Sequence, residues 1–406
     1  MSARREAGTA ARPGPLNPVL AEMADYPFVI LGRQRERLMP KGLEPIHFAA
    51  GDPREETPAF IREALARSVP VMSSYPATEG RAELRAACAR WAERRFGVPL
   101  DPETQVLPLN GSKEGVFLLA LAVVGRGGAA RDTVVIPSPA YPVDAAAAEF
   151  AGARVHLAPL SSAGGWRFDP DQVPDEVWAR TALLWINAPH NPTGAVLDRA
   201  RLLRIAERAR REGFWVAADE AYAEVYFESA PPSMLETGVE NVLAFHTLSK
   251  RSAMTGYRSG FMAGDAGLIA ALRRMRPNVG VATPDFVQHA AIAAWNDDAH
   301  PAEQRARYAA KRALFRDWFA RHGIAIEASE AGFYLWIRAP RPAAPRPGIS
   351  DDVAFVEHLL TLGLTALPGS YLGPGGEGYV RWALVPTVEQ CREAIARLDR
   401  AGVRGA

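Results

Sequence analysis

The sequence predicts an α/β protein, with a mostly parallel sheet in a large domain and a smaller α+β domain after it. The chain has 406 residues, of which 48% are hydrophobic and 23% charged, which is enough for two hydrophobic cores. From residue 46 onward, short β-like runs alternate with amphipathic helical stretches. This alternation is typical of parallel strands that are covered by helices on both faces. After about residue 290 the pattern changes, which predicts a second domain.

The first 45 residues are expected to form a tail and an N-terminal arm. Residues 1–15 carry arginines but no apolar segment, so we expect a flexible tail and no secretory signal. Residues 16–45 predict an N-terminal arm with a helix that ends near Pro40 and packs with the small domain.

Residues 46–290 form the predicted large domain. Its helical stretches include residues 200–211 and one with Leu84, Ala87, Cys88 and Trp91 at helical spacing, which predicts that Cys88 is a buried packing residue. The β-like runs include 134–136, 183–186, 214–218 and 242–245.

Residues 291–406 form the predicted small C-terminal domain. A long charged helical stretch is followed by a strong strand, a proline-rich loop, a helix, a turn and a last strand. The helical stretch is residues 301–322, the first strand 332–337 and the loop 339–348. The turn is residues 368–370 and the last strand 379–384.

Composition excludes several classes of function. The formal net charge of +1 gives no reason to expect nucleic acid as a partner. No apolar stretch approaches the roughly 20 residues that span a bilayer. Two cysteines, Cys88 and Cys391, form no disulfide framework and fit a reducing cytoplasm. We expect a cytoplasmic protein with no metal site.

Lys250 is the most informative residue of the chain, which contains only four lysines. It follows the β-like run 242–245 within Thr247-Leu248-Ser249-Lys250, and Arg258 comes eight residues later in Gly-Tyr-Arg-Ser-Gly. A lysine at a strand end can form a Schiff base, and a nearby guanidinium can bind an anion. Together they indicate the chemistry of pyridoxal 5'-phosphate.

Other strand ends supply the further groups that this cofactor needs. Ser112 and Lys113, in Asn-Gly-Ser-Lys before a helical run, are candidates for a phosphate cradle. A Gly-Ser turn that opens a helix is also a common cap. Tyr141, in the loop after residues 134–136, is a candidate to stack on the ring.

Asp219 ends the run 214–218, in Ala-Asp-Glu-Ala-Tyr. A carboxylate there can keep the pyridine nitrogen protonated, although Asp-Glu after a strand is also typical of a helix N-cap. Tyr222 lies three residues on and is either a second ligand of the cofactor or a half-buried tyrosine.

Asn191 lies in Asn-Ala-Pro-His-Asn-Pro-Thr-Gly, residues 187–194. Two prolines and Gly194 fix this turn and present Asn191 after the strand 183–186. Arg381 is a single charge in the apolar strand 379–384 and needs an anionic partner, which is either a substrate carboxylate or a structural glutamate.

Together these strings resemble the class I/II aminotransferases of fold type I, which use pyridoxal phosphate. The resemblance covers about Leu16 to Leu398 and includes Gly-Asp-Pro at 51–53 and Ser-Tyr-Pro at 74–76. It implies that Lys250 is the Schiff-base lysine, Asp219 the partner of the pyridinium, and Tyr222 a donor to the phenolic oxygen with Asn191. The phosphate contacts that it implies are Ser112, Lys113, Thr247, Ser249 and Arg258.

The resemblance also implies a homodimer, in which Tyr75 reaches the phosphate of the partner subunit. It implies that Gly51 and Arg381 hold the substrate α-carboxylate, that Asn191 also binds substrate, and that Phe333 and Tyr334 line the substrate side. For more distal carboxylates, the cations of residues 33–41 or 273–276 are the candidates.

Within the superfamily the chain resembles the bacterial N-succinyldiaminopimelate aminotransferases. Strings such as Leu-Pro-Leu-Asn-Gly-Ser-Lys and Ala-Gly-Phe-Tyr-Leu-Trp carry this resemblance. It predicts transfer of an amino group from N-succinyl-LL-2,6-diaminopimelate to 2-oxoglutarate, in lysine biosynthesis. The alternatives are an aminotransferase for aspartate, aromatic amino acids or free LL-diaminopimelate, a β-lyase or cyclopropane-forming synthase, and a ligand-sensing domain.

Overall fold

The computed structural model describes residues 16–125, 130–341 and 346–405. The predicted tail, residues 1–15, and part of the proline-rich loop lie outside the described residues. The strands are β1 (Ile46–His47), β2 (Val106–Leu109), β3 (Thr133–Ser138), β4 (Arg154–Pro159), β5 (Thr181–Asn187), β6 (Trp215–Asp219), β7 (Val242–Thr247), β8 (Gly260–Gly264), β9 (Ile326–Ala328), β10 (Tyr334–Arg338), β11 (Leu364–Thr365), β12 (Leu367–Pro368) and β13 (Tyr379–Ala383).

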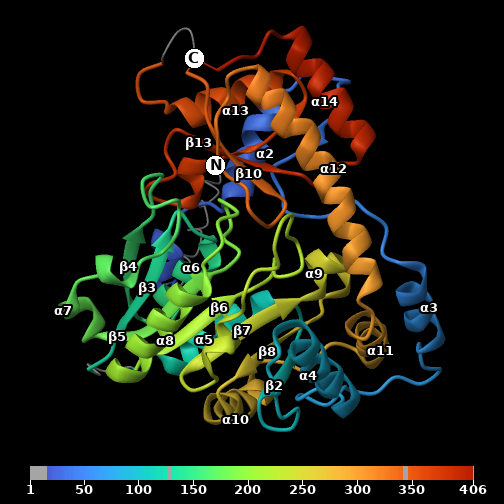
Figure 1. Cartoon of the computed structure of the whole chain (residues 1–406), viewed down its shortest axis with the longest axis vertical. Coiled ribbons are helices and arrows are strands. Elements are labelled where there is room, and N and C mark those ends of the chain that lie inside the picture. The colour runs from blue at the N-terminus through green and yellow to red at the C-terminus, as the bar shows by residue number, and fades with distance from the viewer. Residues whose placement is uncertain (1–15, 126–129, 342–345, 406) are drawn as a thin grey trace, which may run out of the picture.

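The helices alternate with the strands in the middle of the chain and dominate both ends (Figure 1). They are α1 (Pro18–Glu22), α2 (Pro27–Leu38), α3 (Ala59–Arg67), α4 (Ala82–Phe96), α5 (Ser112–Val123), α6 (Pro142–Phe150), α7 (Asp175–Trp178), α8 (Arg199–Glu212), α9 (Leu248–Arg251), α10 (Ala266–Met275), α11 (Asp285–Trp295), α12 (Ala299–Arg321), α13 (Asp351–Thr361) and α14 (Val388–Arg400).

A seven-stranded sheet, in the order β2-β8-β7-β6-β5-β3-β4, forms the centre of the molecule. Neighbouring strands from β7 to β4 are parallel, and β8 runs antiparallel to both β7 and β2. The prediction of a mostly parallel sheet is therefore confirmed. Because β3, β5, β6 and β7 are parallel, their carboxyl ends lie at one edge of the sheet, where α/β proteins bind ligands.

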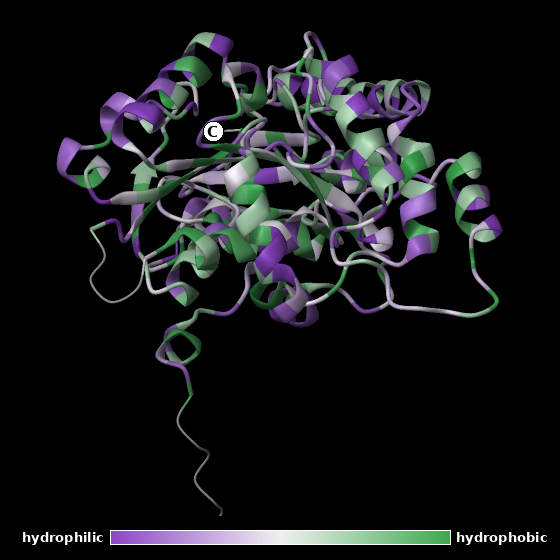
Figure 2. Cartoon of the chain, turned by 90° about the horizontal axis from the view of Figure 1, so that it is seen from below, coloured by the Kyte–Doolittle hydropathy of each residue, from purple (hydrophilic) through white to green (hydrophobic). Residues whose placement is uncertain are grey.

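Side chains of the central strands point alternately into two hydrophobic cores. Leu184, Ile186 and Val216 belong to the core that α8 and α4 share, whereas Leu183 and Trp185 belong to the core under α5, α6 and α10. Helices thus cover both faces of the sheet, as the alternating pattern predicted. Figure 2 shows hydrophilic residues concentrated on the outer sides of these helices.

Local signals fix the bounds of individual helices. The Asp198 side chain accepts a hydrogen bond from the Arg201 N–H (2.8 Å) and begins α8, as N-cap aspartates do. Gly213, with φ 74°, ends the same helix in the left-handed conformation that glycine adopts readily. Cys88 is buried in α4 with Leu84, Ala87 and Trp91, which confirms its prediction as a packing residue.

A second sheet, in the order β12-β13-β10-β9, is antiparallel and lies within residues 326–383. Early and late parts of the chain meet beside it, because β1 pairs with β11 and α2 contacts α13. In Figure 1, α12 runs from this region to the side of the central sheet. Among the residues that the structure describes, no helix is both long and apolar enough to cross a membrane.

Candidate active site

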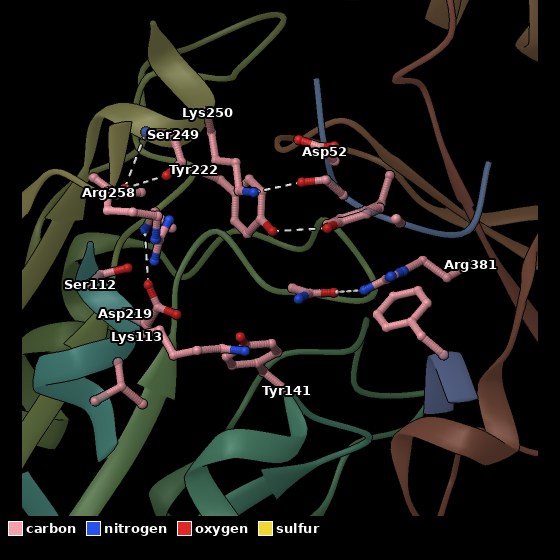
Figure 3. A pocket seen from close by; sticks show the side chains of 18 of the residues that line it. Asp52, Ser112, Lys113, Tyr141, Asp219, Tyr222, Ser249, Lys250, Arg258 and Arg381 are labelled. Atoms are coloured by element: carbon pink, nitrogen blue, oxygen red, sulfur yellow. Dashed lines mark hydrogen bonds between the residues drawn. The ribbon is translucent and has the colours of Figure 1, made fainter. Parts of the chain in front are cut away.

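One cavity of about 540 Å³ lies at the carboxyl ends of the parallel strands (Figure 3). It brings together residues that are far apart in the sequence, and almost all the predicted site residues line it. These are Gly51, Ser112, Lys113, Tyr141, Asn191, Asp219, Tyr222, Thr247, Ser249, Lys250, Arg258, Tyr334 and Arg381.

Lys250 lies in the short helix α9, directly after β7. Its Nζ donates a hydrogen bond to the carbonyl oxygen of Gly51 (2.5 Å). Burial lowers the pKa of Lys250 to about 8, although the charges of Asp52 and Asp219 raise it. An amine with such a pKa is partly neutral near pH 7–8, which a nucleophile and proton carrier needs.

Asp219 is the last residue of β6, and its side chain is buried. Its Oδ1 accepts a hydrogen bond from the Ala221 N–H (3.1 Å). Burial raises the pKa of Asp219 to about 6, against the lowering effects of this hydrogen bond and of Lys250. The carboxylate is therefore a strong acceptor for a cationic N–H donor in the cavity.

The turn after β5 is tied to Asp219. Asn187 donates from Nδ2 to the Asp219 carbonyl oxygen (2.7 Å), and its Oδ1 accepts from the Asn191 N–H. The Oδ1 of Asn191 in turn accepts from Nη1 of Arg381 (2.6 Å). Because its oxygen is engaged, Asn191 presents its NH₂ group as the donor.

Arg381 is buried in β13, and the partners of its guanidinium are neutral oxygens. Nη2 donates to the Ala49 carbonyl oxygen (2.6 Å), and the guanidinium carbon lies 4.5 Å from the ring centre of Tyr334. Its Nε is buried without a hydrogen-bond partner. The sequence left open whether Arg381 pairs with a structural glutamate. No glutamate is among these partners, so the positive charge of Arg381 remains available for an anionic ligand.

Several donors and cations surround the start of α5. Gly111 has φ 76°, and a Cβ there would lie 2.3 Å from Nη2 of Arg258, so only glycine allows this approach. The hydroxyls of Thr247 and Ser249 are hydrogen bonded to each other (3.0 Å). With Ser112 and the N–H groups of α5, they form a site suited to a phosphate dianion.

Two predicted residues lie elsewhere. Tyr75 is 92% exposed and does not line the cavity of its own chain, as expected of a residue that acts across a dimer. Phe333 is fully buried beneath the site, with its ring centre 5.9 Å from Lys250 Nζ and in contact with Tyr222. The predicted direct contact of Phe333 with substrate does not fit this position, since Tyr334 occupies the cavity wall.

Three polar or aromatic residues to which the sequence gave no role also line the cavity. Tyr26 and Phe28 come from the N-terminal arm, and Asp52 follows Gly51. By contrast, none of residues 33–41 or 273–276 lines it. Arg33 pairs with Asp25, and Arg273 donates to the Val106 carbonyl oxygen (3.0 Å). Neither segment therefore lines the described cavity of its own chain.

The residues present fit pyridoxal phosphate. The cavity offers an amine, a buried carboxylate, an amide donor and a cluster of hydroxyls and cations at a helix start. No group of His, Cys, Asp and Glu in the described ranges is arranged to hold a metal ion. Such a donor set suits an anionic organic cofactor with a basic nitrogen.

Comparison with known proteins agrees with this geometry. The sequence profile of aminotransferase class I and II matches residues 44–398. The chain belongs to this family. Its fold is therefore fold type I, and its cofactor is pyridoxal phosphate.

Three relatives show how far the likeness extends. LL-diaminopimelate aminotransferase of Dehalococcoides mccartyi is 37% identical over 390 residues, covering 94% of this chain and 98% of that protein. The 4-dedimethylamino-4-oxo-anhydrotetracycline transaminase OxyQ of Streptomyces rimosus is 37% identical, covering 93% and 100%. A structure of a probable N-succinyldiaminopimelate aminotransferase from Thermus thermophilus has a TM-score of 0.83 at 29% identity, covering 93% and 100%. The first two relatives are equally identical to this chain but are named for different substrates.

Proposed function

We propose that this aminotransferase acts on LL-diaminopimelate, with 2-oxoglutarate as the amino acceptor. The observation that carries the proposal is a pair of cations, Arg381 and Lys113, which point into the cavity from opposite sides (Figure 3). A substrate with a carboxylate at each end matches two separate cations. The name of the Dehalococcoides relative supports the same substrate.

Arg381 is the proposed site for the α-carboxylate at the reacting end. Its guanidinium is held by Asn191 and Ala49 and has no carboxylate among these partners. A planar fork fixed in this way can orient a carboxylate by two hydrogen bonds.

Lys113 is the proposed site for the distal carboxylate. Its Nζ lies 5.6 Å from the ring centres of both Tyr26 and Tyr141. Burial lowers the pKa of Lys113, and Arg258 lowers it further, so an anionic partner is favourable. The backbone N–H of Lys113, in the first turn of α5, remains free for the predicted phosphate contact.

The number of cations favours unmodified LL-diaminopimelate over its N-succinyl derivative. The cations that line the described cavity are Lys113, Lys250, Arg258 and Arg381. With Lys250 and Arg258 assigned to the cofactor, two remain, which equals the number of carboxylates in LL-diaminopimelate. The succinyl group adds a third carboxylate. The succinylated substrate, which the sequence strings favoured, is therefore the second candidate.

The proposed roles of the residues follow from their positions. When bound, pyridoxal phosphate supplies an aldehyde that exchanges amines and a ring that accepts electrons. Asp219 holds a proton on the ring nitrogen, and Asn191 and Tyr222 donate hydrogen bonds to the phenolic oxygen. Lys250 Nζ takes the proton from the substrate Cα. Tyr141 stacks on the ring.

Steady-state kinetics with a set of amino donors tests the substrate. We expect LL-diaminopimelate to give the highest kcat/KM, measured as glutamate formed from 2-oxoglutarate. N-succinyl-LL-diaminopimelate, aspartate and phenylalanine are the comparison donors. A tenfold preference for any of these three would contradict the proposal, and such a preference needs only about 1.4 kcal/mol.

Lys113→Met tests the distal site in the same assay. Loss of a hydrogen bond to a charged group costs about 1.5–3 kcal/mol, so we expect KM for LL-diaminopimelate to rise about 10- to 100-fold. Lys41→Met, at an exposed lysine, is the matched control and should leave KM unchanged. An unaltered KM in Lys113→Met would remove this residue from the distal site.

We also propose that the protein is a homodimer, in which Tyr75 reaches the phosphate site of the partner. Val71 and Met72 are 105% and 84% exposed beside Tyr75, and such an apolar segment is typical of a covered surface. A cavity of about 930 Å³ on the outer side of Arg258 provides room for a tyrosine from a second copy.

Tyr75→Phe and Met72→Asp test the dimer. We expect Tyr75→Phe to remain a dimer and to bind pyridoxal phosphate at least about tenfold more weakly, since a hydrogen bond to a charged group is lost. Met72→Asp should shift sedimentation toward a monomer that binds the cofactor weakly. A fully active monomer of the unaltered chain would contradict the proposal.

A further inference from the structure

Residues 51–57, which we call the strap, begin beside Lys250, where Gly51 and Asp52 line the cavity. Three contacts anchor them. The Gly51 carbonyl oxygen accepts from Lys250 Nζ (2.5 Å), Glu55 accepts from Lys311 Nζ (2.5 Å), and the Thr57 hydroxyl donates to the Ala253 carbonyl oxygen (2.6 Å). Each contact spans about 200 residues or more of sequence, so the strap's position depends on the folded chain.

Asp52 is the residue of the strap that brings a charge to the cavity. The carboxylates that line the described cavity are Asp52 and Asp219, and Asp219 has its proposed partner in the ring nitrogen. The nearest cation outside the cavity, Arg54, lies 4.0 Å away, and both side chains are about half exposed. Such a pair is weak. Arg54 therefore does little to reduce the effect of the Asp52 carboxyl group inside the cavity.

Lys311 holds the strap from the side of α12. Its side chain is fully buried, and that of Glu55 is 16% exposed. A buried ion pair is often no more stable than a well-packed apolar pair, because both charges lose water. It does fix the geometry of the groups that it joins. The sequence is otherwise rich in arginine and contains only four lysines, yet one of them is placed here.

We propose that Asp52 is a positioning residue for Lys250 in the transamination reaction, and that the Lys311–Glu55 ion pair holds it in place. Asp52 places its carboxyl group in the cavity with the Lys250 amine, and the adjacent Gly51 carbonyl oxygen accepts a hydrogen bond from that amine. Both interactions favour the charged amine. They oppose burial, which lowers the pKa of the amine, and so make Lys250 a stronger base.

The surroundings of Lys250 indicate that Asp52 affects the pKa of its amine. Burial is the largest influence on the pKa of Lys250, and the Asp52 charge is the next. Proton transfer is most efficient when the pKa lies near the working pH. The titratable and charged groups that share the described cavity with Lys250 are Tyr26, Asp52, Lys113, Tyr141, Asp219, Tyr222, Arg258, Tyr334 and Arg381.

The first test measures the pKa of Lys250 in the full chain freed of cofactor, by competitive labelling with acetic anhydride and peptide mapping. We expect Asp52→Asn to lower this pKa from about 8, because a charge that favours the ammonium form is lost. Labelling at pH 6 then becomes faster, since a larger fraction of the amine is neutral. Asp52→Glu keeps the charge and should resemble the unaltered chain. An unchanged pKa in Asp52→Asn overturns the proposal.

The second test separates positioning from stability. Lys311→Met removes the anchor, and we expect the pKa of Lys250 to fall as it does in Asp52→Asn. Arg321→Met is the control on the same helix, because Arg321 forms an exposed pair with Asp317. Glu55→Gln replaces Lys311→Met if that variant fails to fold. A folded variant with an unchanged or raised pKa means that the ion pair serves the fold alone.

The loaded enzyme gives an independent readout. We expect the acid limb of the pH profile of kcat to move to lower pH in Asp52→Asn, with KM changed less than twofold. A raised KM with an unmoved profile overturns the proposal in favour of a substrate contact. The inference rests on the role proposed above for Lys250. Labelling needs no cofactor, so failure of that role and failure of the inference are distinguishable.

Discussion

Replacing Lys250 with alanine is expected to lower kcat by at least about 10⁴-fold, the upper range of what general acid–base catalysis contributes. The variant loses the nucleophilic amine and the proton carrier at once. The hydrogen bond to the Gly51 carbonyl oxygen is lost with them. The measurement is glutamate formation from LL-diaminopimelate and 2-oxoglutarate under steady-state conditions.

Two further variants make this result specific. Lys250→Arg retains the charge but provides no amine of suitable pKa, so we expect the same loss. Lys41→Ala, at an exposed lysine, should be fully active. If Lys250→Ala kept more than about one hundredth of the activity, another residue would have to carry the proton.

The order of the elements was predictable because the central strands are buried on both faces. Runs such as 183–186 and 242–245 lie in β5 and β7, and their length and β-branched or aromatic content indicate strands without long-range information. β8 is harder to predict, because glycines at 260 and 264 weaken its β propensity. Its antiparallel direction depends on pairing with β2 and β7, which no local pattern encodes.

The ends of parallel strands explain why residues predicted from the sequence meet in one cavity. Asp219 directly follows one apolar run and Asn191 lies in the turn after another, and parallel strands bring such positions to one edge. Asp52 and Tyr26 lie in segments without a regular pattern, so only the folded chain places them in the cavity. The Lys311–Glu55 pair joins residues 256 positions apart. Contacts of this kind have no signal in a single sequence.

Asp219→Asn is expected to lower kcat by about 10²- to 4 × 10³-fold. Removing one member of a buried charged pair costs about 3–5 kcal/mol, and about 1.4 kcal/mol corresponds to a factor of ten in rate. Asparagine cannot hold a proton on the ring nitrogen, so the ring accepts electrons less well. Since the proposed α-carboxylate site at Arg381 is unaltered, KM should change only a few-fold. Steady-state kinetics measures both constants.

Glu220→Gln is the matched control, at the next carboxyl group along the chain. Glu220 is buried and does not line the cavity. Its Oε1 accepts from the Met234 N–H (2.7 Å), and burial raises its pKa to about 8. Glutamine resembles the neutral acid, so activity should stay within a few-fold. Equal losses in Asp219→Asn and Glu220→Gln would mean that the ring nitrogen has no carboxylate partner at 219.

Reduction of the loaded enzyme with borohydride, followed by digestion and mass spectrometry, tests the covalent role of Lys250 most directly. The structure predicts a single phosphopyridoxyl group, on the peptide that contains Lys250. The other three lysines should remain unmodified. A phosphopyridoxyl group at Lys113 or Lys311, or none on the chain, would contradict the role of Lys250 and the site built around it.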